Sequence, residues 1–229
     1  MKRKLSCILL MLLAFSIFAG CAPSKKSNAE VQRPPRYEEM VQLIGLQKED
    51  VLEKLQIQSA DIQLKSEGGY TTPITVSFNG VTMTIELAFG PLDDRLNGFY
   101  YKAYYQNESE LAAKNMHLVA NSMSTCFGSP DAGNSSYAWD MTEEEIIKSI
   151  DTGEFQNAHS WYMANDSTDQ IEEYIQALSE TELYAGYAKL KMKPGLKCEL
   201  ALSAYANTPT EPVTAYLTIS CHISPVPSK

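Results

Sequence analysis

The chain has 229 residues, of which 44% are hydrophobic and 10% aromatic, and its formal net charge is −9. This apolar content is sufficient for a packed core and excludes a wholly disordered chain. The excess of acidic residues argues against nucleic-acid binding, which needs a basic patch. It also argues against electrostatic adsorption to anionic lipid.

The N-terminus has the pattern of an export signal. Three basic residues at positions 2–4 precede an apolar stretch over 5–18, which is too short for a membrane-spanning helix. The segment that follows, Phe18-Ala19-Gly20-Cys21, resembles the lipobox of bacterial lipoproteins, although Phe18 replaces the usual leucine. The resemblance implies that residues 1–20 are a cleaved signal peptide. It also implies that Cys21 is acylated and anchors a secreted protein to the cell membrane. The alternative is an ordinary signal followed by an incidental cysteine.

Residues 21–36 are expected to form a flexible tether. The stretch has no hydrophobic period and contains Pro34-Pro35 near its end. Fully extended, it would reach about 50 Å from the membrane.

A first helix and sheet unit is predicted over residues 37–106. Two short amphipathic helices over 37–44 and 47–55 precede two alternating strands that flank Asn79-Gly80. An Asn-Gly loop favours a type I′ hairpin turn, which fixes the register of the strands. The expected cross-strand pairs are Phe78 with Val81, Val76 with Met83 and Ile74 with Ile85. A third strand is predicted at Phe99–Tyr105.

The segment from Glu38 to Leu55, followed by these strands, resembles the opening of BLIP-like (β-lactamase-inhibitor-protein-like) lipoproteins. This group includes small outer-membrane assembly lipoproteins. The resemblance covers about residues 37–105 and implies two helices that cap an antiparallel sheet, often in tandem, in a protein that binds other proteins. The chain departs from the family at Gln56-Ile57-Gln58, where a glycine and a proline are common.

A second α+β unit is predicted over residues 107–229. Capping residues and helical spacing indicate three helices, Asn107–Phe127, Thr142–Ile150 and Ser167–Ser179. The first of them is expected to end at Gly128. Strands are expected at Tyr137–Asp140, Asn157–Ala164, Leu183–Lys193, Lys197–Ala206 and Val213–Ile223. The fold class is therefore α+β, with two helix-plus-antiparallel-sheet units and a C-terminal three-stranded antiparallel meander. The alternative is that both units form one domain.

The last two strands can be aligned by their apolar residues. A hairpin centred between Pro209 and Thr210 pairs Leu202 with Leu217, Leu200 with Ile219, and Cys198 with Cys221 on one face. In an oxidising exterior Cys198 and Cys221 could form a cross-strand disulfide, and the alternative is two buried thiols. Cys126, near the end of a helix, is expected to be a packed free thiol.

Motifs for catalysis or metal binding are not found. The sequence contains no CxxC, HExxH, GxSxG or SxxK motif and no phosphate-binding loop. Its acidic clusters lie near helix starts, where they suit the helix dipole. We therefore expect no catalytic residues, no metal and no cofactor, although an enzyme with dispersed catalytic residues would leave no local motif.

The candidate binding residues lie in the aromatic strand Phe99–Tyr105. Alternation places Tyr100 and Tyr104, with Lys102 between them, on the face opposite Phe99, Tyr101 and Tyr105. Exposed tyrosines suit contacts with another envelope protein, although tyrosine is also simply common in strands. The alternative function is a small-ligand or glycan-binding lipoprotein with a pocket between helices and sheet.

Overall fold

The computed structural model of the chain describes residues 33–65, 68–90, 93–133, 140–206 and 211–228. The predicted signal peptide, Cys21 and most of the predicted tether lie outside the described residues, as do three of the four residues of the predicted strand at Tyr137–Asp140.

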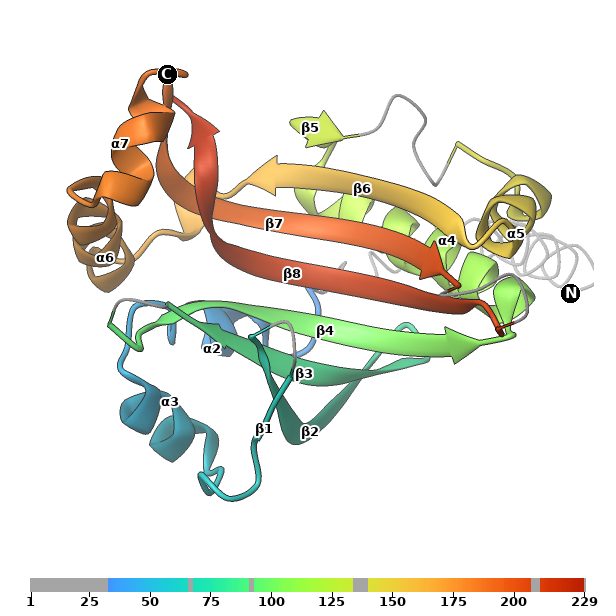
Figure 1. Ribbon diagram of the computed structural model, residues 1–229, viewed down its shortest axis with the longest axis horizontal. Coiled ribbons are helices and arrows are strands. Elements are labelled where there is room, and N and C mark those ends of the chain that lie inside the picture. Colours follow the sequence, from blue (N-terminus) through green and yellow to red (C-terminus); the bar gives the residue numbers. More distant parts are fainter. Residues whose placement is uncertain (1–32, 66–67, 91–92, 134–139, 207–210, 229) are drawn as a thin grey trace, which may run out of the picture. The chain divides into compact units, whose positions relative to one another are not determined.

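The described strands form one antiparallel eight-stranded sheet in the order β1-β2-β3-β4-β8-β7-β6-β5 (Figure 1). The strands are β1 (Gln63–Leu64), β2 (Tyr70–Phe78), β3 (Val81–Phe89), β4 (Leu96–Gln106), β5 (Ala132–Gly133), β6 (Glu154–Tyr162), β7 (Met192–Tyr205) and β8 (Thr214–Pro227).

The prediction of two separate helix-plus-sheet units is wrong, because β4 pairs with β8. Their ladder runs from Gly98 opposite His222 to Gln106 opposite Thr214. Each half of the sheet is a meander whose last strand lies at the centre, next to the last strand of the other half. The pairing gives hydrogen-bond partners to backbone groups that would otherwise be exposed along two long edges. The two halves therefore share one sheet.

The prediction of a C-terminal three-stranded meander is also wrong, because its first strand is not formed. The expected strand Leu183–Lys193 is largely helix α7 (Glu182–Ala188), and β6 takes the place beside β7. The alanines of this segment favour a helix, and Glu182 in its first turn suits the helix dipole. With β6 and β8 on its two sides, β7 has no edge left for another strand.

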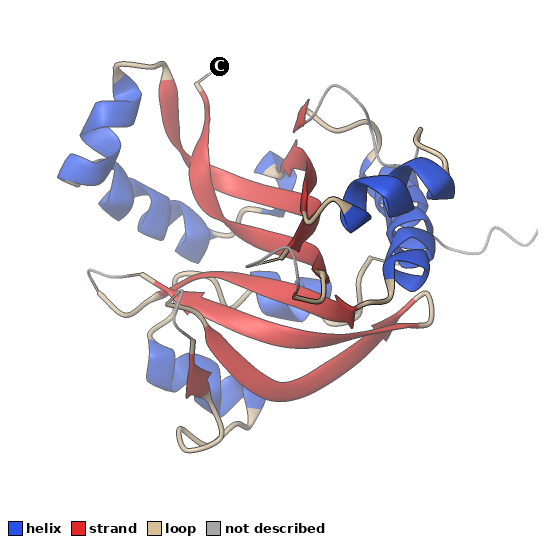
Figure 2. Cartoon of the chain, turned by 45° about the vertical axis from the view of Figure 1, so that its right-hand side comes forward, coloured by secondary structure: helices blue, strands red, loops and turns tan. Residues whose placement is uncertain are grey.

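Six helices and one 3-10 turn are described (Figure 2). They are α2 (Tyr37–Val41), α3 (Lys48–Leu55), α4 (Ser109–Phe127), α5 (Glu143–Asp151), η1 (Ala164–Asp166), α6 (Asp169–Ser179) and α7 (Glu182–Ala188).

Of the three N-terminal caps predicted in the second half of the chain, one is present as predicted. The capping box of Thr142 and Glu145 is present at α5. Helix α4 begins at Ser109 without a side-chain cap, because Asn107 has a positive φ of 57° and lies outside the helix. Helix α6 is capped by Thr168 and not by Ser167.

The predicted hairpin registers agree closely with the structure. Phe78 lies opposite Val81 and Val76 opposite Met83, but an irregularity between Thr71 and Thr75 removes the expected pair of Ile74 with Ile85. At the other hairpin, all three predicted pairs are formed: Leu202 with Leu217, Leu200 with Ile219, and Cys198 with Cys221.

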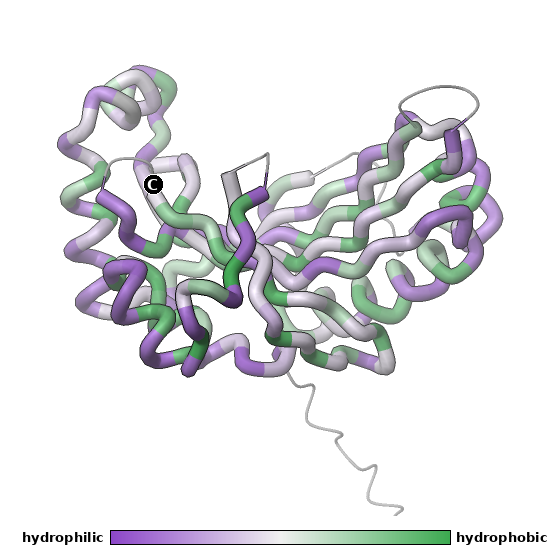
Figure 3. The backbone as a smooth tube through the Cα atoms, turned by 60° about the horizontal axis from the view of Figure 1, so that its bottom comes forward, coloured by the Kyte–Doolittle hydropathy of each residue, from purple (hydrophilic) through white to green (hydrophobic). Residues whose placement is uncertain are grey.

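A single apolar core fills the space between one face of the sheet and the helices. Hydrophobic and hydrophilic residues alternate along the central strands (Figure 3), so that one face is apolar and the other polar. The core face carries Phe99, Tyr101, Ile219 and Leu200, which are essentially inaccessible to solvent. Helices α2 and α4 lie behind the central strands in the view of Figure 1, so the opposite face of the sheet is turned to the viewer.

The last residues of the predicted tether, 33–36, pack against the folded domain. The Arg33 guanidinium donates two hydrogen bonds to Asp166, at 2.9 and 3.2 Å, and lies 4.9 Å from the ring centroid of Tyr37. The Tyr101 hydroxyl donates to the Pro35 carbonyl at 2.9 Å. The chain is therefore held to the domain from at least Arg33 onward. None of the described helices is sufficiently long and apolar to cross a membrane.

Candidate functional site

The candidate site is the polar face of the sheet, called here the open face. It comprises Tyr100, Lys102 and Tyr104 of β4 together with their same-face neighbours on β3, β8 and β7. The alternation predicted from the sequence is confirmed, because Phe99, Tyr101 and Tyr105 are buried in the core. Tyr104 is 44% exposed, whereas Tyr100 and Lys102 are half-buried.

A buried carboxylate organises one side of this face. Glu86 of β3 is only 2% exposed and lies between the ammonium groups of Lys65 and Lys102, at 2.8 and 2.7 Å. The Tyr104 hydroxyl donates to Glu86 at 2.6 Å and accepts from Lys65 at 2.8 Å. Burial opposes ionisation of Glu86, but hydrogen bonds from Lys102, Lys65 and Tyr104 outweigh it and lower the pKa of the carboxyl. We call these four residues the Glu86 cluster, and it fixes the orientation of Tyr104.

Three tyrosines form a continuous row across the central strands. The ring of Tyr104 meets that of Tyr216 on β8 edge to face, with centroids 5.0 Å apart. Tyr216 stacks on Tyr205 of β7 at 5.1 Å, and the two hydroxyls are hydrogen-bonded to each other. Tyr205, like Tyr104, is 44% exposed. This tyrosine row (Tyr104, Tyr216 and Tyr205) presents aromatic surface whose orientation is set by its neighbours.

Sequence reasoning missed Tyr205 and Tyr216 as members of this surface. The predicted β7–β8 register already placed both tyrosines on the face opposite Leu202 and Leu217. The sequence did not predict the pairing of β4 with β8, which brings Tyr216 beside Tyr104.

A second aromatic pair lies farther along β4. The rings of Tyr100 and His222 are nearly parallel, with centroids 6.0 Å apart. The strands can approach here because residue 98 is glycine: a Cβ at this position would lie 2.3 Å from the Cβ of His222. Burial lowers the pKa of His222 to about 4, with a further decrease from Lys197 that Glu199 partly offsets. His222 is therefore neutral at pH 7, and its buried Nδ1 has no hydrogen-bond partner among the described residues.

The arrangement of the open face suits a binding surface. Its aromatic rings are held by hydrogen bonds and ring contacts, so they would lose little conformational entropy on contact with a partner. In the described part of the chain, no group of three or more His, Cys, Asp or Glu is placed to hold a metal ion.

The three cysteines among the described residues, Cys126, Cys198 and Cys221, do not lie on the open face. Cys198 and Cys221 are free thiols, fully buried on the core face, and the Tyr37 hydroxyl lies 3.9 Å from the Cys221 sulfur. Burial raises the pKa of both thiols, that of Cys221 to about 12, which disfavours a nucleophilic thiolate. Cys126 is a half-buried free thiol near the C-terminal end of α4. Cys198 and Cys221 lie opposite each other on β7 and β8 and are unbonded in the structure, so their disulfide stays a prediction for oxidising conditions.

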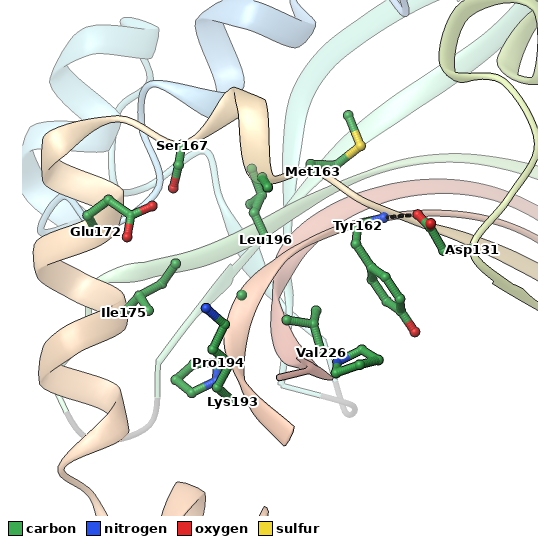
Figure 4. Close-up of a pocket in the computed structure, with 13 residues that line it drawn as sticks. Asp131, Tyr162, Met163, Ser167, Glu172, Ile175, Lys193, Pro194, Leu196 and Val226 are labelled. Atoms are coloured by element: carbon green, nitrogen blue, oxygen red, sulfur yellow. Dashed lines mark hydrogen bonds between the residues drawn. The ribbon is translucent and has the colours of Figure 1, made fainter. Parts of the chain in front are cut away.

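A pocket of about 320 Å³ lies beside the sheet, between η1, α6 and the paired ends of β7 and β8 (Figure 4). Helix α6 contributes Glu172 and Ile175, and β7 contributes Lys193 and Leu196. The alternative prediction from the sequence, a small-ligand or glycan-binding lipoprotein, calls for a pocket of this kind between helices and sheet.

Comparisons with protein-family models, with curated protein sequences and with solved structures found no match for this chain. The resemblance of residues 37–105 to BLIP-like lipoproteins accordingly has no support beyond the sequence pattern itself.

Proposed function

We propose that the chain is a bacterial envelope lipoprotein, anchored through acylated Cys21, that binds another envelope protein through the open face. On this proposal the chain is not an enzyme. The observation that carries it is the tyrosine row, which lies on the sheet face opposite the core and is positioned by the Glu86 cluster.

The dimensions of the open face suit a protein partner. Its organised side chains come from four adjacent strands, β3, β4, β8 and β7. Neighbouring strands are about 4.8 Å apart, so these four strands span roughly 15 Å across the sheet. A surface rich in tyrosine is typical of the centre of a protein–protein interface.

The charge pattern supports binding through aromatic contacts. Lys65 and Lys102 are paired with Glu86, and Lys197 is paired with Glu199 at 2.9 Å. Paired charges hold their positions while adding little net charge, which leaves the tyrosines as the main source of binding energy. Alanine substitution of tyrosine at the centre of an interface typically costs about 2 kcal/mol or more.

The binding proposal is tested by crosslinking in intact cells, capture of the membrane-bound protein and mass spectrometry. We compare the natural chain with a Tyr100→Ala/Tyr104→Ala variant. The control is Leu111→Ala/Leu118→Ala, because both leucines are exposed on α4, away from the open face. Loss of one specific envelope protein from the tyrosine variant alone is the expected result. Capture of the same partner by all three chains contradicts the proposal.

The anchoring proposal is tested separately with a Cys21→Ser variant. We expect this variant to lose metabolic labelling by palmitate and to leave the membrane fraction, because an acylated cysteine provides the membrane attachment. Retention of the label in Cys21→Ser would contradict acylation at this residue.

A further inference from the structure

The pocket beside the sheet has features of a ligand site separate from the open face. Its volume of about 320 Å³ lies at the lower end of the range for small-molecule pockets. Its walls come from η1, α6, β7 and β8, together with Asp131 and the end of β6.

Apolar side chains line the middle of the pocket. Ile175 of α6, Leu196 of β7, and Val226 of β8 lie between the two ends of the pocket in Figure 4. Val226 can pack against the backbone of β7 because residue 195 is glycine: a Cβ there would lie 2.4 Å from a methyl carbon of Val226. The pocket therefore offers a hydrophobic seat for a compact hydrocarbon group.

The charged groups that line the pocket are two carboxylates and one ammonium. Glu172 lies at one end of the pocket and Asp131 at the other, where Asp131 accepts a hydrogen bond from the Tyr162 backbone N–H at 2.7 Å (Figure 4). Lys193 of β7 also lines the pocket. No described residue forms an ion pair with Glu172, Asp131 or Lys193, whereas the charges at the centre of the open face are paired. The charged lining of the pocket thus has a net negative charge that attracts a cation.

We propose that this pocket binds a small amphiphilic amine, with its apolar body against Ile175, Leu196 and Val226 and its ammonium group beside Glu172. The ammonium has two chemical sources, a simple amine or an apolar amino acid. In an amino acid, Lys193 receives the carboxylate. This binding activity does not depend on the open face.

Three probes with the same type of branched hydrocarbon body distinguish these cases: 3-methylbutylamine, L-leucine and 4-methylpentanoate. Binding of each to the full chain is measured by isothermal titration calorimetry and by saturation-transfer NMR. The proposal predicts that 3-methylbutylamine binds and that 4-methylpentanoate binds at least tenfold more weakly. Leucine binding that is weakened by Lys193→Gln identifies an amino acid as the ligand class. Binding of the amine without leucine identifies a simple amine.

Variants of the pocket locate the binding site. Glu172→Gln should weaken amine binding about fivefold, as expected for loss of a solvent-exposed charge pair. Glu173→Gln is the matched control, because Glu173 is the next residue of α6 but does not line the pocket. Ala164→Trp, at an exposed position of the rim, should abolish binding by filling the space. The Tyr100→Ala/Tyr104→Ala variant should bind the amine normally.

Three results would overturn the proposal. They are no binding of any probe at millimolar concentration, equal binding of the amine and of 4-methylpentanoate, and equal effects of Glu172→Gln and Glu173→Gln. Circular dichroism and thermal unfolding of each variant establish that the chain is folded during the titrations.

Discussion

Replacement of Glu86 by alanine is expected to destabilise the fold and to release Tyr104. The carboxylate of Glu86 is 2% exposed and accepts hydrogen bonds from Lys65, Lys102 and Tyr104 at 2.6 to 2.8 Å. Its removal leaves two ammonium groups close together and a tyrosine hydroxyl without its acceptor. The two lysines are partly accessible, at 24% and 19% of their side-chain surfaces, so water can solvate them in part.

The expected magnitude follows from these exposures. Removal of one partner from a fully buried ion pair costs about 3–5 kcal/mol, whereas a surface pair is worth about 0–1 kcal/mol. Because the carboxylate is buried but both lysines reach solvent, we expect Glu86→Ala to lower the free energy of unfolding by about 2–3 kcal/mol. Glu86→Gln preserves the shape and one acceptor oxygen, so its effect should be smaller.

The assay is urea denaturation at pH 7, followed by circular dichroism and tyrosine fluorescence. Lys65→Met and Lys102→Met are measured alone and with Glu86→Ala, because double-mutant cycles isolate the coupling within a network. We expect coupling of Glu86 to both lysines. A loss below about 0.5 kcal/mol for Glu86→Ala, the scale of a surface substitution, would refute the role assigned to the cluster.

Three further predictions concern other parts of the domain. Arg33→Ala should lower the free energy of unfolding by about 2 kcal/mol in urea melts, because it leaves Asp166 without its guanidinium partner. The control Arg36→Ala should lower it by less than about 1 kcal/mol, because the ion pair of Arg36 is exposed. Acidification should destabilise the chain through His222, whose pKa of about 4 in the folded state lies below its value of about 6.5 in the unfolded state. The free energy of unfolding is highest above pH 6.5 and falls by up to about 3 kcal/mol as the pH is lowered to 4. The variant His222→Asn should flatten this part of the stability–pH curve. An unchanged curve would contradict the assignment to His222. Gly98→Ala should lower the free energy of unfolding by about 2 kcal/mol or more in the same melts, because the Cβ of the alanine would clash with the Cβ of His222. An unchanged free energy of unfolding would show that the strands can separate at this point.

Local parts of the fold could be predicted because the necessary information lies within a few residues. Asn79-Gly80 and the alternation around it specify the β2–β3 hairpin, and three matching pairs specify the β7–β8 register. The contact between β4 and β8 could not be predicted in this way, since the two strands are more than one hundred residues apart and no turn connects them. Helix α7 was missed because the lysines that follow it, at positions 189, 191 and 193, alternate with apolar residues as in a strand.

The candidate site was predicted in part for the same reason. The strand period alone places Tyr100 and Tyr104 on one face of β4. The Glu86 cluster and the tyrosine row depend on neighbours from other strands, which only the sheet order supplies. The pocket is formed by residues from Asp131 to Pro227, and no spacing within the sequence predicts it.

The most direct test of the central claim places a photo-crosslinking amino acid at position 104 of the full chain in living cells. The control places it at position 118, which has similar exposure on α4: the side chains of Tyr104 and Leu118 are 44% and 42% exposed. If the open face is the binding surface, position 104 crosslinks to one specific envelope protein and position 118 does not. Equal crosslinking at both positions, or a specific product from position 118 alone, would contradict the account.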